Sequence, residues 1–235
     1  RSSAASDVYK RQVSRHALKC GELVVSSGSV VDAHVSAIVN AANERCLGGG
    51  GVDGAITRAG GELLAEKRLA LPVHHNKRCK TGDAVITSGG PFSDLKCDCV
   101  IHAVGPDYRR LPPAKEDEDD DLARGDSILK NAYTAAMKRA KEQKCKTVAF
   151  SLLSAGIFRG RQSLDNVLRC AVEAIGDATY PGLQRVHLVA FSTKEQEALA
   201  RVIEIPEIKR GRLELALRWR YDKNFYWEEP EHMLV

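Results

Sequence analysis

Residues 37–61 read Ala-Ile-Val-Asn-Ala-Ala-Asn-Glu-Arg-Cys-Leu-Gly-Gly-Gly-Gly-Val-Asp-Gly-Ala-Ile-Thr-Arg-Ala-Gly-Gly, and this stretch indicates the fold most strongly. Its apolar start is typical of a buried strand, with Asn40 and Asn43 at the carboxyl end. Four consecutive glycines follow, and a helical pattern begins near Asp53. Ligands of open α/β sheets bind outside the carboxyl ends of strands, and a glycine loop entering a helix suits phosphate. The stretch therefore predicts a phosphate-binding loop between a buried strand and a helix.

Two simpler interpretations of this stretch compete with the first. The glycines could form a passive turn, but ordering four glycines costs considerable conformational entropy, which makes a purely passive turn a poor explanation. Asp53 could be a simple helix N-cap, and on spacing alone that is the better interpretation of this residue.

A second segment, residues 148–160, repeats the arrangement of a buried strand followed by small residues. It reads Val-Ala-Phe-Ser-Leu-Leu-Ser-Ala-Gly-Ile-Phe-Arg-Gly. We expect the backbone amides of its turn to form an anion-binding nest, with the Ser154 hydroxyl as a further donor. The turn would expose Ile157 and Phe158, although an ordinary core role for Phe158 remains an alternative.

The remaining apolar pattern alternates between short strand-like runs and longer helical ones. This alternation predicts an α/β domain with helices on both faces of a largely parallel or mixed sheet. We expect helices from Asp126, which would be the cap, from Ser163, and after a capping box formed by Thr193 and Gln196. Residues 107–125 are expected to be a long surface loop. The predicted strands are residues 22–25, 35–39, 83–87, 98–104, 147–152 and 185–191.

Length and composition limit the classes of protein to which the chain can belong. The 235 residues, 43% hydrophobic, suffice for one substantial core with appendages. The net charge of +4 is spread along the chain, so no concentrated nucleic-acid-binding face is predicted. Seven cysteines without a regular framework favour reduced thiols, an intracellular protein and no metal site. No apolar stretch reaches the roughly 18 residues of a membrane-spanning helix.

The chain divides into three parts by composition. Residues 1–12 are expected to be a disordered or non-native leader, and residues 13–204 to be the folded domain. Residues 205–235 contain a cluster of aromatic residues. They are expected to be an extension that packs on the domain, with partner binding as the alternative.

The runs 39–43 and 47–56 strongly resemble the hydrolytic macrodomains of the MacroD type, and the resemblance covers roughly residues 20–204. It implies a three-layer α/β/α fold with a central mixed, largely parallel sheet. It also implies that Asn43 contacts the distal ribose of ADP-ribose and that Asp53 orients or activates the attacking water. Asn40 would anchor the loop through its side chain. The residues implied to surround the distal ribose and the adjoining phosphate are Gly49, Gly50, Gly51 and Val52.

The resemblance extends to the second segment and to two isolated positions. Phe158 would pack against the distal ribose, and Phe191 would stack on adenine. His102 is interpreted as a packed, hydrogen-bonded core histidine rather than a catalytic group. The residues implied to form the second phosphate-binding loop are Ser154, Ala155, Gly156, Ile157 and Phe158.

Several positions depart from the family pattern. Ser29 and Val30 stand where the family has the Asp-Ile of Gly-Asp-Ile, whose aspartate accepts the adenine amino group. Ser29 still offers a hydrogen bond, but without the charge, a difference of about 1 kcal/mol; Asp32 is a neighbouring alternative acceptor. Thr57 replaces a histidine found in many relatives, and Arg159 replaces a small residue and is expected to be solvated.

These observations favour an enzyme that hydrolyses mono-ADP-ribosyl linkages, either on acidic protein side chains or in O-acyl-ADP-ribose. The expected partner is ADP-ribose or a mono-ADP-ribosylated protein, with no cofactor and a monomeric chain. A non-catalytic ADP-ribose reader is the alternative function. Processing of nucleic-acid ends is a third and weaker one.

Overall fold

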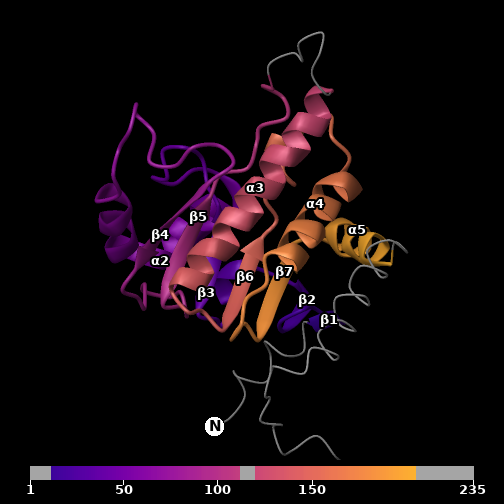
Figure 1. Ribbon diagram of the computed structural model, residues 1–235. Helices are drawn as coiled ribbons and strands as arrows, with labels where there is room; N and C mark the ends of the chain where they lie inside the picture. The colour runs from indigo at the N-terminus through magenta and orange to yellow at the C-terminus, as the bar shows by residue number, and fades with distance from the viewer. Residues whose placement is uncertain (1–11, 112–119, 205–235) are drawn as a thin grey trace, which may run out of the picture.

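The computed structural model describes residues 12–111 and 120–204, which contain one seven-stranded sheet (Figure 1). The strand order is β1-β2-β7-β6-β3-β5-β4. The five central strands are parallel, and β1 and β4 are antiparallel edge strands. The prediction of a mixed, largely parallel sheet is therefore confirmed. The strands are β1 (Gln12–Ala17), β2 (Glu22–Ser27), β3 (Ala37–Ala41), β4 (Ala84–Ser88), β5 (Cys99–Ala103), β6 (Thr147–Ser151) and β7 (Arg185–Ala190).

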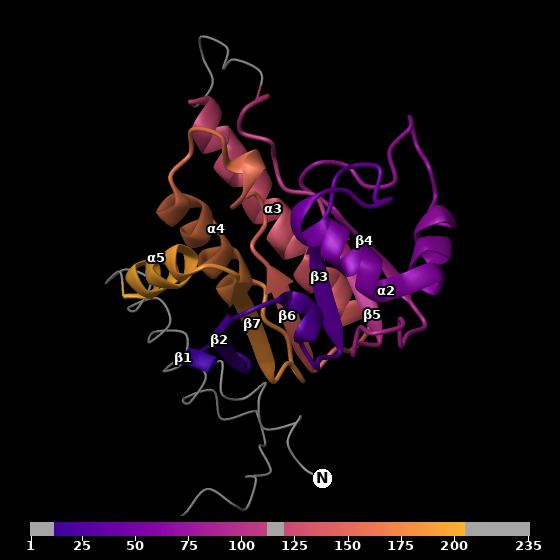
Figure 2. The same ribbon diagram turned by 180° about the vertical axis from the view of Figure 1, so that it is seen from behind.

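Helices cover both faces of the sheet, as a three-layer α/β/α fold requires (Figures 1 and 2). One face carries α2 (Gly51–Leu69) and the short 3-10 helix η1 (Val30–Asp32). The other carries α3 (Asp121–Glu142), α4 (Leu164–Asp177) and α5 (Thr193–Ile203). A second 3-10 helix, η2 (Ile157–Arg159), follows β6.

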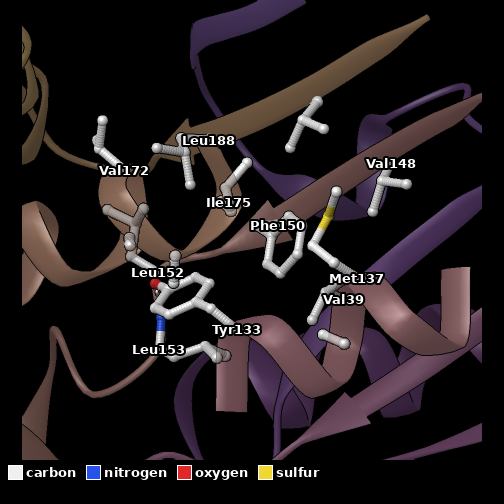
Figure 3. Close-up of a cluster of buried hydrophobic side chains, with 14 of the residues drawn as sticks. Val39, Tyr133, Met137, Val148, Phe150, Leu152, Leu153, Val172, Ile175 and Leu188 are labelled. Carbon is white, nitrogen blue, oxygen red and sulfur yellow. Dashed lines mark hydrogen bonds between the residues drawn. The ribbon is translucent and has the colours of Figure 1, made fainter. Parts of the chain in front are cut away.

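The central strands are apolar on both sides because each side faces a core. In β3, Val39 packs into the core beneath α3, α4 and α5, whereas Ile38 packs into the core beneath α2. In the larger core, the rings of Tyr133 and Phe150 lie 5.4 Å apart (Figure 3). The Tyr133 hydroxyl accepts a hydrogen bond of 2.9 Å from the Leu153 amide, which fixes the start of the loop after β6.

Helix α2 bends sharply at Gly61, whose φ of 60° and ψ of −160° are not helical. Figure 2 shows the two halves of α2 running in different directions. A Cβ added at Gly61 would lie 3.1 Å from the Ser93 Cβ, so this backbone conformation and this close approach both favour glycine. The bend turns the second half of α2 away from the course that a straight helix would take.

Two predicted helix starts were wrong. Helix α3 begins at Asp121 with Asp120 as its N-cap, so part of the expected surface loop is helical. Asp126 is not a cap: its carboxylate accepts hydrogen bonds from Tyr108, Gln162 and Asn166. The capping box of α5 lies one residue earlier than expected, at Ser192 and Glu195.

The sequence analysis also missed β1, which begins at Gln12, a residue assigned to the leader. This edge strand reads Gln-Val-Ser-Arg-His-Ala, which contains no apolar run, and it pairs antiparallel with β2. The rest of the expected leader and the expected C-terminal extension, residues 1–11 and 205–235, lie outside the described residues. Within the described part of the chain, no helix is both long and apolar enough to cross a membrane.

Candidate functional site

A crevice opens at the carboxyl ends of β3 and β6, which are parallel neighbours in the sheet. The chain leaves β3 toward α2 on one face and leaves β6 toward α4 on the opposite face. In open α/β sheets, ligands bind where the connections that follow two neighbouring strands go to opposite faces of the sheet. A cavity of about 500 Å³ lies there. Its lining residues are Ala41, Ala42, Asn43, Gly49, Gly50, Gly51, Val52, Asp53, Gly105, Leu152, Ser154, Gly156, Ile157 and Phe158.

The glycine loop presents backbone rather than side chains to this cavity. Cβ atoms added at Gly50, Gly51 or Gly156 would meet no atom within 4 Å, so the chain there faces open space. Helix α2 begins at Gly51 with Gly50 as its N-cap. Asp53 is therefore not the N-cap, and that alternative interpretation was wrong. The positive end of the helix lies beside the cavity, as an anion-binding site requires.

The Asp53 side chain is 5% exposed, and its two oxygens differ in their surroundings. Oδ1 accepts hydrogen bonds from Asn40 Nδ2 at 2.8 Å and from an Arg68 guanidinium nitrogen at 3.2 Å. Oδ2 is buried and has no hydrogen-bond partner among the described residues. Asp53 and Gly49 both line the cavity, and Oδ2 lies on the Gly49 side of the carboxylate.

A buried hydrogen-bond chain holds Asn40 in place. The Asn40 amide donates both to Asp53 and, at 3.2 Å, to Nδ1 of His102, whose Nε2 lies 3.1 Å from the Thr87 hydroxyl. Burial, followed by the charge of Arg68, lowers the pKa of His102 well below its usual value. His102 is therefore the neutral core histidine that the sequence predicted. Asn40 makes side-chain hydrogen bonds, as the resemblance implied, but they go to Asp53 and His102 and not to the glycine loop.

Asn43 anchors the glycine loop instead. Its amide donates to the Gly48 carbonyl at 3.0 Å, and its side-chain oxygen accepts from the Arg45 amide at 3.0 Å. A Cβ added at Gly49 would lie 3.3 Å from Asn43 Nδ2 and 3.2 Å from Asp53 Oδ2. The structure thus brings together the two residues expected to act on the distal ribose, with Gly49 between them.

The second loop differs from expectation at Ser154. Its hydroxyl donates a hydrogen bond of 2.8 Å to the Pro106 carbonyl. This bond links the loop after β6 to the loop after β5, and the hydroxyl proton is not directed to a phosphate. Ser154 has a φ of 54°, and Ala155 behind it is buried. Phe158 is half-buried at the cavity wall, and the Arg109 guanidinium lies 5.8 Å from its ring centroid. Phe158 is therefore available to a ligand and is not a core aromatic.

Residues expected near adenine follow the next two strands along the same edge of the sheet. Ser29 lies two residues after the end of β2 and Phe191 directly after β7, and these strands pair in parallel up to Ser27 and Ala190. Phe191 is 80% exposed. Ser29 and Asp32 line a separate cavity of about 350 Å³. Val30 is buried in the core beneath η1, so only its backbone can face a ligand.

Sequence reasoning missed Arg68, a fully buried arginine that contacts Asp53 from 15 residues further along the chain. Its second guanidinium nitrogen donates to the Thr57 hydroxyl at 2.7 Å, and that hydroxyl donates to the Asp53 carbonyl at 2.7 Å. The Gly60-Gly61 pair inside a helical pattern is the signal that could have indicated a bend.

Arg159, expected to be solvated, is half-buried and donates to the Gln162 carbonyl at 2.7 Å.

The thiols do not gather into a metal site. All seven cysteines are free, and six of them are buried. Over residues 12–111 and 120–204, no group of three or more His, Cys, Asp or Glu side chains is arranged to hold a metal ion.

Known proteins are similar to this chain over a region that includes the residues of the crevice. The profile of the family described as Macro domain matches residues 39–171. O-acetyl-ADP-ribose deacetylase 1 of Pantoea vagans is 37% identical over 189 residues, which cover 77% of this chain and 98% of the relative. The Oceanobacillus iheyensis macrodomain with ADP superposes with a TM-score of 0.70 at 26% identity, covering 81% of this chain and 94% of that chain. The Trypanosoma brucei macrodomain in complex with ADP-ribose gives 0.61 at 29% identity, covering 77% and 68%.

Proposed function

This chain belongs to the macro domain family, and we propose that it binds ADP-ribose in the crevice between β3 and β6 and hydrolyses mono-ADP-ribosyl linkages there. The observation that carries the proposal is the buried Asp53 carboxylate, with one oxygen fixed by two donors and the other unpartnered on the side of Gly49, a residue that lines the cavity. A buried polar atom without a partner is costly, so a polar ligand or a water that satisfies it stabilises the site.

The shape of the crevice supports an extended nucleotide ligand. The diphosphate would lie over the glycine loop and the first turn of α2, where backbone amides and the helix dipole favour negative charge. Adenine would extend along the sheet edge toward Phe191 and Ser29. The distal ribose would then lie between Asp53 and Asn43 on one side and Phe158 on the other.

In this arrangement Asp53 acts as the general base. Its Oδ2 accepts a hydrogen bond from a water and takes its proton as the water oxygen attacks the ester carbonyl or the anomeric carbon of the distal ribose. Attack at the carbonyl breaks the bond between the acyl carbon and the ribose oxygen, and attack at the anomeric carbon breaks the bond between that carbon and the substituent oxygen. The proton held by Asp53 then passes to the leaving oxygen or to solvent, which restores the carboxylate. Loop amides and the α2 N-terminus stabilise the negative charge of the ligand and of the developing oxyanion.

The substrates consistent with this chemistry are acidic protein side chains that carry mono-ADP-ribose and small O-acyl-ADP-ribose esters. The name of the Pantoea vagans relative supports the second kind. A reader that binds ADP-ribose without cleaving it is the second candidate. The observation that favours it is Thr57, which stands where many hydrolytic relatives have a histidine and is here engaged by Arg68.

Two measurements test the proposal. Calorimetric titration with ADP-ribose, with AMP as the control, should show clearly tighter binding of ADP-ribose because only it occupies both loops. Single-turnover incubation with a mono-ADP-ribosylated acidic peptide and with O-acetyl-ADP-ribose should release free ADP-ribose. Binding without release would establish the reader function, and equal affinity for AMP would contradict the two-loop site.

A further inference from the structure

We infer that Arg68 is a positioning residue that determines which oxygen of Asp53 faces the bound substrate. The inference rests on the proposed function, because it assigns to Arg68 the orientation of the general base. It concerns a residue outside the cavity lining and far from the two loops in sequence.

Arg68, Thr57 and Asp53 form a closed ring of hydrogen bonds. One guanidinium nitrogen of Arg68 donates to Asp53 Oδ1, and another donates to the Thr57 hydroxyl. The Thr57 hydroxyl in turn donates to the backbone carbonyl of Asp53. The same arginine therefore fixes the side chain of Asp53 directly and its backbone through Thr57.

Without Arg68, the carboxylate would keep only the Asn40 donor. A single donor leaves a carboxylate free to rotate about its terminal bond and to exchange its two oxygens, since that torsion is soft. With a second donor from the α2 side, Oδ1 is saturated and Oδ2 stays toward Gly49. A general base needs its proton-accepting oxygen in one place, because small displacements cost large factors in rate.

The surroundings of Arg68 favour a geometric role over a stabilising one. The side chain is 1% exposed, and its Nε has no hydrogen-bond partner among the described residues. Burial lowers the pKa of Arg68, while the charge of Asp53 opposes that change. A buried ion pair with an unsatisfied donor contributes little to the free energy of folding, since desolvation offsets the attraction.

The bend in α2 brings Arg68 next to Asp53. On a straight helix, residues 15 positions apart would be separated by about 22 Å. The bend at Gly61 turns the second half of α2 so that Arg68 reaches Asp53 at 3.2 Å. Gly60, beside the bend, is equally constrained, because an added Cβ would lie 2.2 Å from the Leu64 side chain.

Two mild substitutions test the inference. Arg68→Lys keeps the charge but cannot bridge Asp53 and Thr57 together, and Thr57→Val removes the link to the backbone while leaving the ion pair. We expect kcat to fall about tenfold or more in Arg68→Lys and less in Thr57→Val. The Kd for ADP-ribose should stay within about threefold, because a residue that acts only on the general base affects turnover more than binding. Arg58→Lys, at an exposed position of the same helix, is the matched control and should leave both quantities unchanged.

A crystal structure of Arg68→Met supplies a readout that does not depend on activity. We expect its Asp53 carboxylate to be rotated or to occupy two orientations. An Asp53 that keeps its orientation in this variant, or wild-type kcat in both mild variants, would overturn the inference. If the unaltered protein binds ADP-ribose but releases nothing, the hydrolase proposal alone fails, and the orientation of Asp53 in Arg68→Met still decides the role of Arg68.

Discussion

The guanidinium of Arg68 lies 3.2 Å from Oδ1 of Asp53, although 15 residues separate the two along α2. Together with Asn40, this contact occupies one oxygen of the carboxylate and leaves the other, Oδ2, buried beside Gly49 with no partner among the described residues. This difference between the two oxygens is the basis of the proposed role of Asp53 as a general base. It also leads to specific predictions for several variants.

Asp53→Asn should remove turnover while leaving ligand binding largely intact. The amide keeps the volume of the carboxylate but cannot take a proton from water, so we expect kcat to fall by about 100-fold or more. Single-turnover kinetics and calorimetry with ADP-ribose measure the two effects separately. Asp165→Asn, on the exposed surface of α4, is the control. Normal turnover by Asp53→Asn would show that another group activates the water.

Gly49→Val should disable the site through a steric effect. A Cβ at Gly49 would lie 3.2 Å from Asp53 Oδ2 and 3.3 Å from Asn43 Nδ2, so a branched side chain would separate the two. We expect a loss in kcat/KM of about 100-fold, with a circular dichroism spectrum like that of the unaltered protein. Gly176→Ala in α4, where an added Cβ meets nothing within 4 Å, should keep full activity. Comparable kinetics for the two variants would contradict the geometry.

Phe191→Ala should weaken nucleotide binding without unfolding the protein. Phe191 is 80% exposed, while its backbone amide is fixed by the Glu195 carboxylate at 2.8 Å, so its ring is available for stacking. Loss of stacking on adenine should raise Kd about fivefold, equally for ADP-ribose and AMP. Leu69→Ala, at another exposed apolar residue, should change neither Kd. An unchanged Kd in Phe191→Ala would place adenine elsewhere.

Gly61→Ala should destabilise the fold and displace Arg68. The position has a φ of 60°, which disfavours an L side chain, and the added methyl would meet the Ser93 Cβ at 3.1 Å. We expect the free energy of unfolding to fall by about 1–2 kcal/mol, measured by urea denaturation. Ser93→Gly should relieve the contact but not the backbone strain at position 61. Because Ser93 itself has a φ of 47°, the double variant is compared with Ser93→Gly alone, and against that reference only part of the loss should return. Full recovery would mean that the backbone conformation itself costs nothing.

Stability should decrease as the pH falls below about 6.5, the pKa of an unfolded-state histidine. Burial, followed by the charges of Arg185 and Arg15, lowers the pKa of His187 to about 4, and burial also lowers that of His102. The unfolded chain binds these protons first, so acid favours it, by roughly 1 kcal/mol per pH unit for each histidine. Urea denaturation between pH 7 and pH 5 measures this slope. His187→Gln should reduce it, and an identical slope in that variant would contradict the assignment.

Local sequence patterns predicted six of the seven strands, because the apolar pattern of a strand reflects which of its faces are buried. The run in β3 is continuously apolar since Ile38 and Val39 face separate cores. Ser163 caps α4 as predicted, because a cap involves only residues of one turn. The glycine loop and the asparagines before it are likewise contiguous, so the sequence alone located the candidate site at the carboxyl ends of β3 and β6.

The particular contacts of the site were decided by the tertiary structure. Whether Ser154 offers its proton to a ligand or to Pro106 depends on a loop 48 residues away. Arg68 reaches Asp53 across the bend of α2 at Gly61, and Asn40 on β3 contacts both Asp53 on α2 and His102 on β5. The apolar periodicity of a segment shows which of its side chains are buried, but the hydrogen-bond partners of those side chains depend on which segments pack together. The sequence therefore indicated which residues form the site. Only the tertiary structure decided that Oδ1 of Asp53 is held by two donors while Oδ2 has none.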